Sequence, residues 1–349
     1  MQALILAGGE GTRLRPLTST IPKPIVTLVD RPFIVYMIEW LRGHGVDDVI
    51  LACGFMAADV KAELGDGNQL GVRLRYVEEP TPLGTGGALK YAEELLDERF
   101  LMLNGDVLTD IDLSEQLAQH ERTGARATLA LIEVADPSAY GLVRLAADHA
   151  VTAFVEKPPP GAPGPNLINA GTYILERGVL DEMAPAGTNI SIERDVFPQL
   201  VGRGLFGYQS RAYWLDIGTP ERYLEGTFDI LSGAVLTELT DRPRDGVLIQ
   251  AGCDLAPSAT IGPDVVLGPG VSVGEDAIVE RSVLLEGASV GAGSAVRSAI
   301  VGPRARIGEG CRIDGGVLGE GATVSPHSTL DPGARIFPGV VAPTGANEL

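Results

Sequence analysis

The first 24 residues hold the side chains whose types and spacing are best suited to chemistry on a phosphate. The small and basic residues of this stretch are Gly8, Gly9, Gly11, Thr12, Arg13, Arg15 and Lys23. Glycines let backbone N–H groups approach a phosphate closely, and the planar guanidinium of arginine adds paired donors. Two prolines hold Lys23 in a stiff, extended segment. The stretch therefore predicts a site that holds a polyphosphate.

The spacing of the glycines excludes two common phosphate-binding motifs. The chain contains no G-x-x-x-x-G-K-[ST] P-loop, and its glycines do not fit the G-x-G-x-x-G dinucleotide fingerprint. A Gly-Gly pair after a strand can also be only a tight turn. The longer string that runs from Gly8 to Thr18, followed by Pro22-Lys23-Pro24, is far more specific than such a turn.

An aspartate follows another apolar run at a position suited to a hard cation. Asp106 lies in Asn104-Gly105-Asp106, directly after the apolar residues 100–103. Mg²⁺ prefers one or two carboxylates together with phosphate oxygens. An isolated N-G-D would be read as an ordinary turn, so this prediction depends on the phosphate loop that accompanies it.

The elements that must position these residues alternate between strand and helix over residues 1–233. Strands are expected at 3–7, 49–52, 72–77, 100–103, 127–135, 142–155 and 169–175, and helices at 32–41, 87–97, 192–201 and 220–232. This alternation predicts an α/β, Rossmann-like layered domain with a mostly parallel, mixed sheet. Ligands in such sheets bind beyond the carboxyl ends of the strands, where the glycine loop and Asp106 are expected to lie.

The sequence changes character from Asp245 onward. Aliphatic residues recur every six positions with regular resets by five, so that Leu267, Leu284, Val301 and Leu318 are 17 residues apart. Such a repeat predicts a solenoid of stacked coils. The pattern resembles the hexapeptide repeat of left-handed parallel β-helices, although 17 residues per coil departs from a regular 18. The expected organisation is a catalytic domain at 1–233, a linker at 234–246, the β-helix at 247–338 and a tail at 339–349.

The N-terminal string G-G-E-G-T-R-L-R-P-L-T with P-K-P resembles the signature of the sugar-1-phosphate nucleotidyltransferases, and the resemblance extends over about 1–233. It implies in-line attack of a sugar 1-phosphate on the α-phosphorus of a nucleoside triphosphate. It also implies Mg²⁺ on Asp106 and Asp216. Arg13 would hold the β- and γ-phosphates, Lys23 would neutralise the α-phosphate region, and Lys157 would fix the nucleophile.

The same resemblance assigns two sets of binding residues. The nucleotide set is Leu6, Ala7, Gly8, Gly9, Gly11, Thr12, Arg13, Glu78, Glu79, Gly84 and Thr85. The sugar-phosphate set comes from the Y-G, E-K-P and N-A-G segments and is Gly141, Glu156, Lys157, Asn169 and Gly171.

The segment 78–88 bears on the choice of base. Its P-L-G-T-G-G-A, with L-N-G-D-V-L-T-D at 103–110 and S-I-E-R-D-V-F-P at 191–198, resembles the guanylyltransferase branch, particularly the mannose-1-phosphate guanylyltransferases. Guanine presents N1–H and N2–H₂ as paired donors, which the carboxylate of Glu78 or Glu79 could accept. GTP and mannose 1-phosphate are therefore the expected substrates. Thymidylyl, adenylyl or uridylyl transfer to glucose 1-phosphate and guanylyl transfer to heptose 1-phosphate stay open.

Composition bounds the partners. The net charge of −19 over 349 residues argues against nucleic acid and anionic membranes as partners. The three cysteines are far apart and form no zinc or disulfide pattern, which favours a reduced, cytoplasmic protein. A homo-oligomer is expected, and the β-helix is expected either to mediate assembly or to pack on the catalytic domain. Two other functions are less favoured. Asp106, Asp216, Arg13 and Lys23 argue against a silent regulatory sugar-nucleotide binder, and an acyltransferase β-helix would have His327 as the solenoid's only histidine.

Overall fold

The computed structural model describes residues 1–156, 166–239, 243 and 245–343. It divides into two compact units. The first contains Met1–Gly9 and Ile34–Trp214, and the second contains Glu10–Phe33 and Leu215–Leu349. The glycine-containing string is thus divided, since Gly8 and Gly9 belong to the first unit, whereas the segment Glu10–Phe33, called the glycine-rich segment below, groups with the C-terminal part of the chain. No helix in the described parts of the chain is long and apolar enough to span a membrane.

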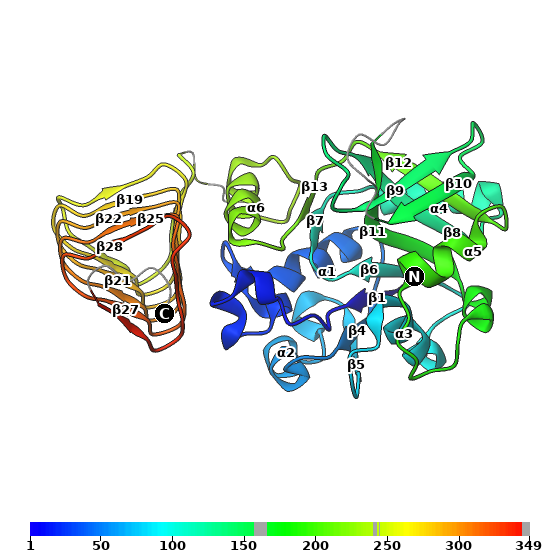
Figure 1. Ribbon diagram of the computed structural model, residues 1–349, viewed down its shortest axis with the longest axis horizontal. Coiled ribbons are helices and arrows are strands. Elements are labelled where there is room, and N and C mark those ends of the chain that lie inside the picture. The colour runs from blue at the N-terminus through cyan, green and yellow to red at the C-terminus, as the bar shows by residue number, and fades with distance from the viewer. Residues whose placement is uncertain (157–165, 240–242, 244, 344–349) are drawn as a thin grey trace. The chain divides into compact units, whose positions relative to one another are not determined.

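A nine-stranded mixed sheet forms the centre of the first unit (Figure 1). Its main order is β10-β9-β11-β6-β1-β4-β5, and β8 and β12 continue from β11. The strands are β1 Gln2–Leu6, β4 Asp48–Cys53, β5 Arg73–Glu78, β6 Arg99–Asn104, β8 Ala127–Glu133, β9 Gly141–Leu145, β10 Val151–Glu156, β11 Leu167–Glu176 and β12 Leu205–Ser210. β1, β4, β5 and β6 are parallel, whereas β11 is antiparallel to β6, β8 and β9. The predicted mixed sheet is confirmed, although parallel pairing dominates only the half around β1.

The apolar run at the N-terminus forms the central strand, as predicted. Ala3, Leu4 and Ile5 of β1 are fully buried between β4 and β6. The helices of this unit are α1 Phe33–Gly43, α2 Ala57–Leu64, α3 Gly84–Tyr91, α4 Leu113–Thr123 and α5 Phe197–Leu200. A short strand, β7 Val107–Thr109, follows the turn after β6.

Two predicted helices differ from the observed ones. The helix expected at 87–97 is α3, which begins at Gly84 and gives way to a 3₁₀ turn at Glu93–Leu95. Leu95 lies in this 3₁₀ turn and is 38% exposed. The helix expected at 192–201 starts after its Ser191 cap as a π-helix, Ile192–Val196, and continues as α5. Pro198 lies in the first turn of α5, where its missing N–H would have no helical partner in any case.

The second unit contains the glycine-rich segment, helix α6 and the solenoid. The segment forms 3₁₀ turns and a small hairpin, which are η1 Thr12–Leu14, η2 Leu17–Ser19, η3 Lys23–Ile25, β2 Thr27–Leu28 and β3 Arg31–Pro32. β13, Trp214–Asp216, leads into α6, Pro220–Ser232. Thr219 caps α6 by accepting the N–H of Arg222, as its Thr-Pro-Glu start predicts.

The solenoid consists of stacked coils whose strands form three sheets, and all strand pairs in these sheets are parallel (Figure 1). The first sheet is β14 Val247–Ile249, β17 Val265–Leu267, β20 Ser282–Leu284, β23 Ile300–Val301, β26 Val317–Leu318 and β29 Arg335–Ile336. The second is β15 Asp254–Leu255, β18 Ser272–Val273, β21 Ser289–Val290, β24 Arg306–Ile307, β27 Thr323–Val324 and β30 Val341–Ala342. The third is β16 Thr260–Ile261, β19 Ile278–Glu280, β22 Ala295–Arg297, β25 Arg312–Asp314 and β28 Thr329–Leu330.

The register of these sheets confirms the repeat read from the sequence. Val283 pairs with Ile300 and Ile300 with Val317, so the middle coils are 17 residues long. Of the aliphatic residues predicted to point inward, those from Leu267 to Ile336 are 3% exposed or less, whereas Leu255 and Ile261 in the first coil are only half-buried. This arrangement is consistent with the expected left-handed β-helix. Its last strand, β30, lies within the segment that was expected to be a tail.

Candidate functional site

The carboxyl ends of the parallel strands bring several loops into close backbone contact. Gly105 N–H donates to the carbonyl of Leu6 at 2.9 Å, and Ala7 N–H donates to that of Ala52 at 2.8 Å. A Cβ on Gly105 would lie 2.4 Å from the Leu6 carbonyl oxygen, so no larger residue fits there. The loop after β1 and the turn before Asp106 are therefore packed against each other, at the edge where α/β sheets bind ligands.

The two glutamates considered for base recognition have different surroundings. Glu78 is the exposed last residue of β5, whereas Glu79 is half-buried. Glu79 Oε1 lies 2.9 Å from the point that a Cβ on Gly8 would occupy, and its Oε2 accepts the N–H of Leu83 at 3.1 Å. Burial raises the pKa of Glu79, although the bond from Leu83 opposes this. Of the two carboxylates, only that of Glu79 faces the glycine loop.

Gly84 and Thr85 begin α3 and pack against residues 188–193. Gly84 has φ +73°, and a Cβ on it would lie 2.6 Å from the Ile190 carbonyl oxygen. The Thr85 hydroxyl donates to Glu193 at 2.7 Å and accepts the N–H of Ile192 at 3.0 Å. The side chain of Thr85 thus holds the start of α3, and a nucleotide contact at these two residues stays a prediction.

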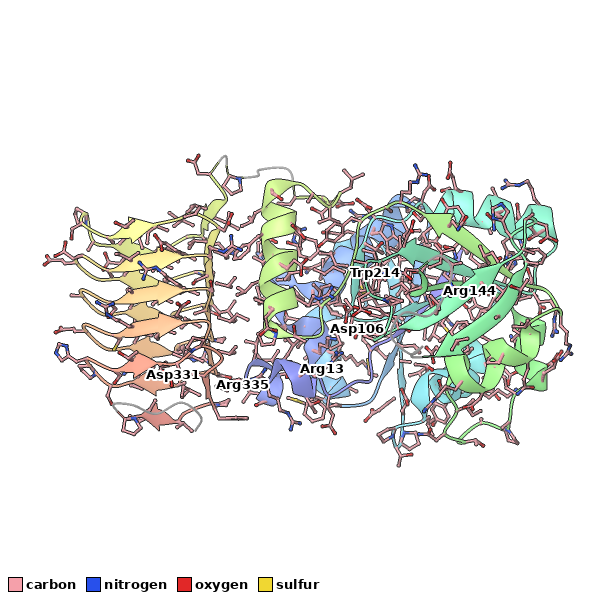
Figure 2. The ribbon with its side chains drawn as sticks, turned by 45° about the horizontal axis from the view of Figure 1, so that its top comes forward. Arg13, Asp106, Arg144, Trp214, Asp331 and Arg335 are labelled. Atoms are coloured by element: carbon pink, nitrogen blue, oxygen red, sulfur yellow. The ribbon has the colours of Figure 1, made fainter. Side chains whose placement is uncertain are left out.

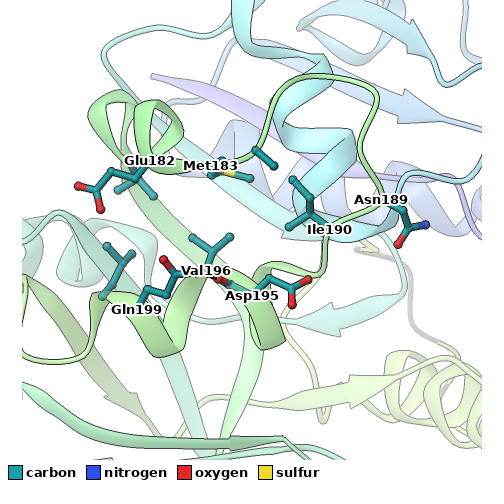
Figure 3. A pocket seen from close by; sticks show the side chains of 10 residues that line it. Glu182, Met183, Asn189, Ile190, Asp195, Val196 and Gln199 are labelled. Atoms are coloured by element: carbon teal, nitrogen blue, oxygen red, sulfur yellow. Dashed lines mark hydrogen bonds between the residues drawn. The ribbon is translucent and has the colours of Figure 1, made fainter.

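Residues beside those that Thr85 contacts also line a separate cavity of about 310 Å³. Figure 3 shows Asn189, Ile190 and Asp195 among its walls. Its acidic groups already have partners, because Glu182 pairs with Arg126 at 2.6 Å and Asp195 accepts the N–H of Ser191 at 2.8 Å. No ligand is assigned to this cavity.

Within the second unit, the glycine-rich segment is folded tightly on itself. Gly11 has φ +61°, and the Thr18 hydroxyl donates to its carbonyl at 2.7 Å. A Cβ on Gly11 would lie 3.1 Å from both Thr18 Cγ2 and Lys23 Cβ. Lys23 is only 9% exposed, and burying an ammonium is favourable only where opposite charge or hydrogen bonds compensate. Thr12, by contrast, is exposed at the start of η1.

Asp216 lies between two arginines. Arg222 Nη1, from the first turn of α6, is 3.5 Å from Asp216 Oδ1. A Cβ on Gly218 would lie 2.7 Å from Arg13 Nη2 and 3.2 Å from Asp216 Oδ2. Arg13 and Asp216 thus converge on the same bare glycine. A carboxylate flanked by two guanidinium groups can accept a metal while the arginines turn to phosphate oxygens.

Asp106 follows a side chain with an unusual environment. Asn104 Oδ1 is buried and has no hydrogen-bond partner among the described residues. Its Nδ2 lies 2.8 Å from the point that a Cβ on Gly171 would occupy. A buried amide oxygen without a donor is costly unless a ligand or water satisfies it. The segment 104–106 therefore offers hard oxygen atoms, which suit a divalent cation.

The residues expected to contact the sugar phosphate lie on neighbouring strands of the first unit. Gly141 of β9 pairs with Glu156 of β10, and Leu142 pairs with Ile168 of β11, one residue before Asn169. A bulge between Asn169 and Tyr173 places Gly171 at φ +73°. Asn169 Oδ1 accepts the N–H of Gly171 at 3.1 Å.

An aromatic pair packs beside this bulge. Trp214 Nε1 donates to the carbonyl of Ala170 at 2.8 Å, and the Trp214 ring meets that of Tyr140 edge to face, with 5.3 Å between the ring centroids. The Glu156 side chain and all of Lys157 lie outside the described residues.

Several residues of this region were not singled out from the sequence. They are Asn104, Glu193, Trp214, Gly218 and Arg222. Gly218 and Trp214 lie in the same Y-W-L-D-I-G-T segment as Asp216. Their position beside Asp216 in the sequence could therefore have indicated them. No cluster of three or more His, Cys, Asp or Glu side chains that could hold a metal occurs among the residues that the structure describes.

Comparisons with known proteins bear directly on this site. Residues 2–233 match the nucleotidyl transferase family, and residues 244–340 match the family described as the GMPPB C-terminal domain. A mannose-1-phosphate guanylyltransferase of Mycobacterium tuberculosis is 38% identical over 75% of this chain and 73% of its own length. The catalytic subunit beta of the Xenopus tropicalis mannose-1-phosphate guanylyltransferase is 40% identical over 65% of this chain. The match spans 63% of that Xenopus protein, slightly less than two thirds.

Solved structures agree with this grouping. HddC from Yersinia pseudotuberculosis is 31% identical, with a TM-score of 0.58 over 66% of this chain and 99% of its own. The same protein complexed with GMP-PN gives a TM-score of 0.57. A putative glucose-1-phosphate thymidylyltransferase from Bacillus anthracis, 24% identical with a TM-score of 0.59, shares the fold. The chain therefore belongs to the nucleotidyl transferase family, among the relatives of the mannose-1-phosphate guanylyltransferases, and it continues into a GMPPB-type C-terminal domain.

Proposed function

We propose that this enzyme transfers a guanylyl group from GTP to mannose 1-phosphate, giving GDP-mannose and pyrophosphate. The observation that carries the proposal is the convergence of Arg13 and Asp216 on Gly218, in a family whose members join nucleotides to other groups. The M. tuberculosis and Xenopus relatives named above supply the choice of substrates.

The reaction is an in-line displacement. A phosphate oxygen of mannose 1-phosphate attacks the α-phosphorus of GTP, the bond to the bridging oxygen breaks, and pyrophosphate leaves with that oxygen. The attacking phosphate is already ionised at neutral pH, so the chain has to position and neutralise the phosphates. Arg13 would bind the departing β- and γ-phosphates, and Lys23 would offset charge at the α-phosphate. Lys157 would hold the attacking phosphate.

A divalent cation completes the site, and we propose that it is Mg²⁺ held by Asp106 and Asp216. When bound, it would polarise phosphate oxygens and offset the charge that develops on them. The chain supports the pairing by its own connections. Thr109 donates to the carbonyl of Tyr213 at 2.6 Å, and Tyr213 N–H donates to Asp110 at 2.8 Å. The segment after Asp106 thus holds the backbone three residues before Asp216.

The sugar and the base would be bound by separate parts of the first unit. The N–H of Gly141 and the side chains of Glu156 and Asn169 are proposed to contact the sugar hydroxyl groups, with Gly171 keeping the bulge open. Glu79 is proposed to accept the paired donors of guanine, because it faces Gly8 whereas Glu78 is exposed. Leu6, Ala7, Gly8 and Gly9 would present their backbone to the nucleotide.

The test is pyrophosphate release with Mg²⁺ across a grid of nucleoside triphosphates and sugar 1-phosphates. The strongest turnover is expected with GTP and mannose 1-phosphate. Asp106→Asn and Asp216→Asn should each lower kcat by about 100-fold or more, which corresponds to about 2.7 kcal/mol. Asp59→Asn, an exposed carboxylate on α2, is the matched control and should keep full activity.

The other outcomes decide between the alternatives. Turnover confined to another pair, such as heptose 1-phosphate with GTP, would keep the mechanism and replace the substrates. A wild-type protein that binds sugar nucleotides without turnover would instead be a regulatory subunit.

We also propose a cytoplasmic homo-oligomer that assembles through the β-helix. Ile249 and Val341, in the first and last strands of the solenoid, are 47% and 60% exposed. Apolar side chains exposed at the ends of a solenoid are suited to contacts between copies. Light scattering of the purified protein should give a multiple of the 36.6 kDa chain mass, and a monomeric mass would contradict the proposal.

A further inference from the structure

In the first sheet of the β-helix, one residue from each coil forms a column of outward-pointing side chains. This column is apolar until the last coil, where it ends in an arginine. In the first sheet, Val266, Val283, Ile300 and Val317 are successive partners, and Arg335 is the partner of Val317. The four apolar side chains are 4% exposed or less. Arg335, at the next step of this column, is only half-buried, and its donors need acceptors that the apolar column does not offer.

Those acceptors lie in the glycine-rich segment of the same unit. Arg335 Nη1 donates to the carbonyl of Arg13 at 3.1 Å and also contacts the carbonyl oxygen of Arg15. Figure 2 shows Arg335 on the side of the solenoid that faces Arg13. The β-helix therefore holds the backbone of the residue whose guanidinium lies at Gly218.

Two further contacts join the solenoid to this segment. The Thr20 hydroxyl donates to Glu320 at 3.0 Å, and Gln250 Nε2 donates to the carbonyl of Val29 at 3.1 Å. Glu320 and Gln250 are solenoid residues, so the segment is held along its length. Only the contact of Arg335 involves the peptide groups of the phosphate-binding arginines.

Arg335 also acts on the start of α6. A hydrogen bond from the Thr219 hydroxyl is the main cause that lowers the pKa of Glu221, and the positive charge of Arg335 lowers it further. The charge of Arg335 thus acts on the first turn of α6, and its Nη1 holds the loop that contains Arg13. Both contacts come from one nitrogen, Nη1, at the end of the arginine side chain, and a lysine would not reproduce them because its side chain is one heavy atom shorter.

We propose that Arg335 is a positioning residue that sets the backbone at Arg13 for binding the triphosphate. The β-helix is then part of the nucleotide site as well as an assembly module. The inference rests on the proposed function, because it assumes that Arg13 binds the β- and γ-phosphates. Arg335 itself touches neither substrate.

The experiment compares Arg335→Ala and Arg335→Lys with Arg306→Ala, which removes an exposed arginine from the second sheet. Steady-state kinetics are measured for each substrate, and thermal unfolding is followed in parallel. Both Arg335 variants should raise KM for GTP about tenfold, while KM for mannose 1-phosphate stays within about twofold of wild type. A misplacement of about 1 Å is enough for an effect of this size. Arg306→Ala should match wild type.

Two results would overturn the inference. One is a KM for GTP in both Arg335 variants equal to that of Arg306→Ala. The other is a parallel loss for both substrates together with a lower Tm, which would indicate a structural role alone. Should Arg335→Ala fail to fold, Arg335→Lys keeps the positive charge and the alkyl stem. It then decides the question by the same comparison of KM for GTP with KM for mannose 1-phosphate.

Calorimetric titration of the protein with GTP in the presence of Mg²⁺ separates this inference from the proposed function. If the wild-type protein binds GTP but turns over no sugar phosphate, the proposed function fails. The Kd of Arg335→Ala relative to wild type then decides the positioning role, with a tenfold increase supporting it and an equal Kd overturning it.

Discussion

Arg13 Nη2 lies 2.7 Å from the point that a Cβ on Gly218 would occupy, and Asp216 Oδ2 lies 3.2 Å from the same point. The absence of a side chain at Gly218 thus lets a guanidinium from the N-terminal segment reach the carboxylate at the start of the α6 region. Gly218 does not require a positive φ, so its role is the space it leaves.

This relationship gives the first prediction. Gly218→Ala should lower kcat/KM for GTP by about 10- to 100-fold, because the new methyl group displaces the end of Arg13 by about 1 Å. The Tm should change by no more than about 2 °C, since the end of a flexible side chain can move at little cost. Gly43→Ala, where the space is open, is the control for steady-state kinetics and thermal unfolding. Unchanged kinetics in Gly218→Ala would remove Arg13 from the proposed site.

Base selection is predicted to depend on Glu79 and not on Glu78. Glu79→Gln should lower kcat/KM for GTP about 10- to 100-fold relative to ATP, because the amide offers guanine one acceptor and adds a donor. Glu78→Gln, its neighbour and matched control, should stay within about twofold of wild type. The measurement is the ratio of kcat/KM for GTP and ATP in the three proteins. An equal decrease of kcat/KM for GTP and for ATP in Glu79→Gln would indicate instead that Glu79 supports the loop through its bond with Leu83.

The thiol of Cys53 is predicted to be unreactive in the folded protein. Burial raises its pKa to about 12, with a further contribution from the charges of Glu79 and Glu78. At pH 8 only about one thiol in 10,000 would be a thiolate, which is the reactive form. Iodoacetamide followed by peptide mass spectrometry should label the partly exposed Cys253 and spare Cys53 until the protein is unfolded. Labelling of native Cys53 at the rate of Cys253 would contradict this.

Stability is predicted to fall with acidification through a buried histidine. His120 is 1% exposed and contacts Thr128 at 2.8 Å and Glu176 at 3.0 Å. Burial lowers the pKa of His120, so the unfolded chain takes up the proton first as the pH falls. The stability that His120 contributes is therefore present above about pH 6.5 and is lost progressively below it.

Its partner extends the effect to lower pH. Burial alone would raise the pKa of Glu176, but hydrogen bonds from His120 and Arg99 outweigh it and lower that pKa. Its contribution is present above the ordinary glutamate pKa and is lost below it. Thermal unfolding of wild type and His120→Gln between pH 8 and pH 5 should show a smaller loss of Tm with acidification in the variant. Parallel profiles would show that His120 is not the titrating group.

The sequence by itself determined the architecture and the chemical class. Periodicity is local, so the buried run of β1, the Thr219 cap of α6 and the 17-residue coil could be read from neighbouring residues. The glycine loop, Asp106 and Asp216 could likewise be chosen from their residue types and motif context. The ends of helices could be predicted less well from the sequence, because the start of α3 depends on the carbonyl of Ile190, about a hundred residues away.

Only the tertiary structure decided which of two similar residues faces the site and what holds the site in place. Glu78 and Glu79 are adjacent and chemically identical, but Glu78 is the exposed last residue of β5, whereas Glu79, whose N–H donates to the carbonyl of Cys53, turns its carboxylate toward Gly8. Arg335 is one arginine among several in the solenoid, and its contact with Arg13 exists because six coils of fixed rise bring it to that segment. Contacts between residues more than 300 positions apart depend on packing geometry, which no local pattern records.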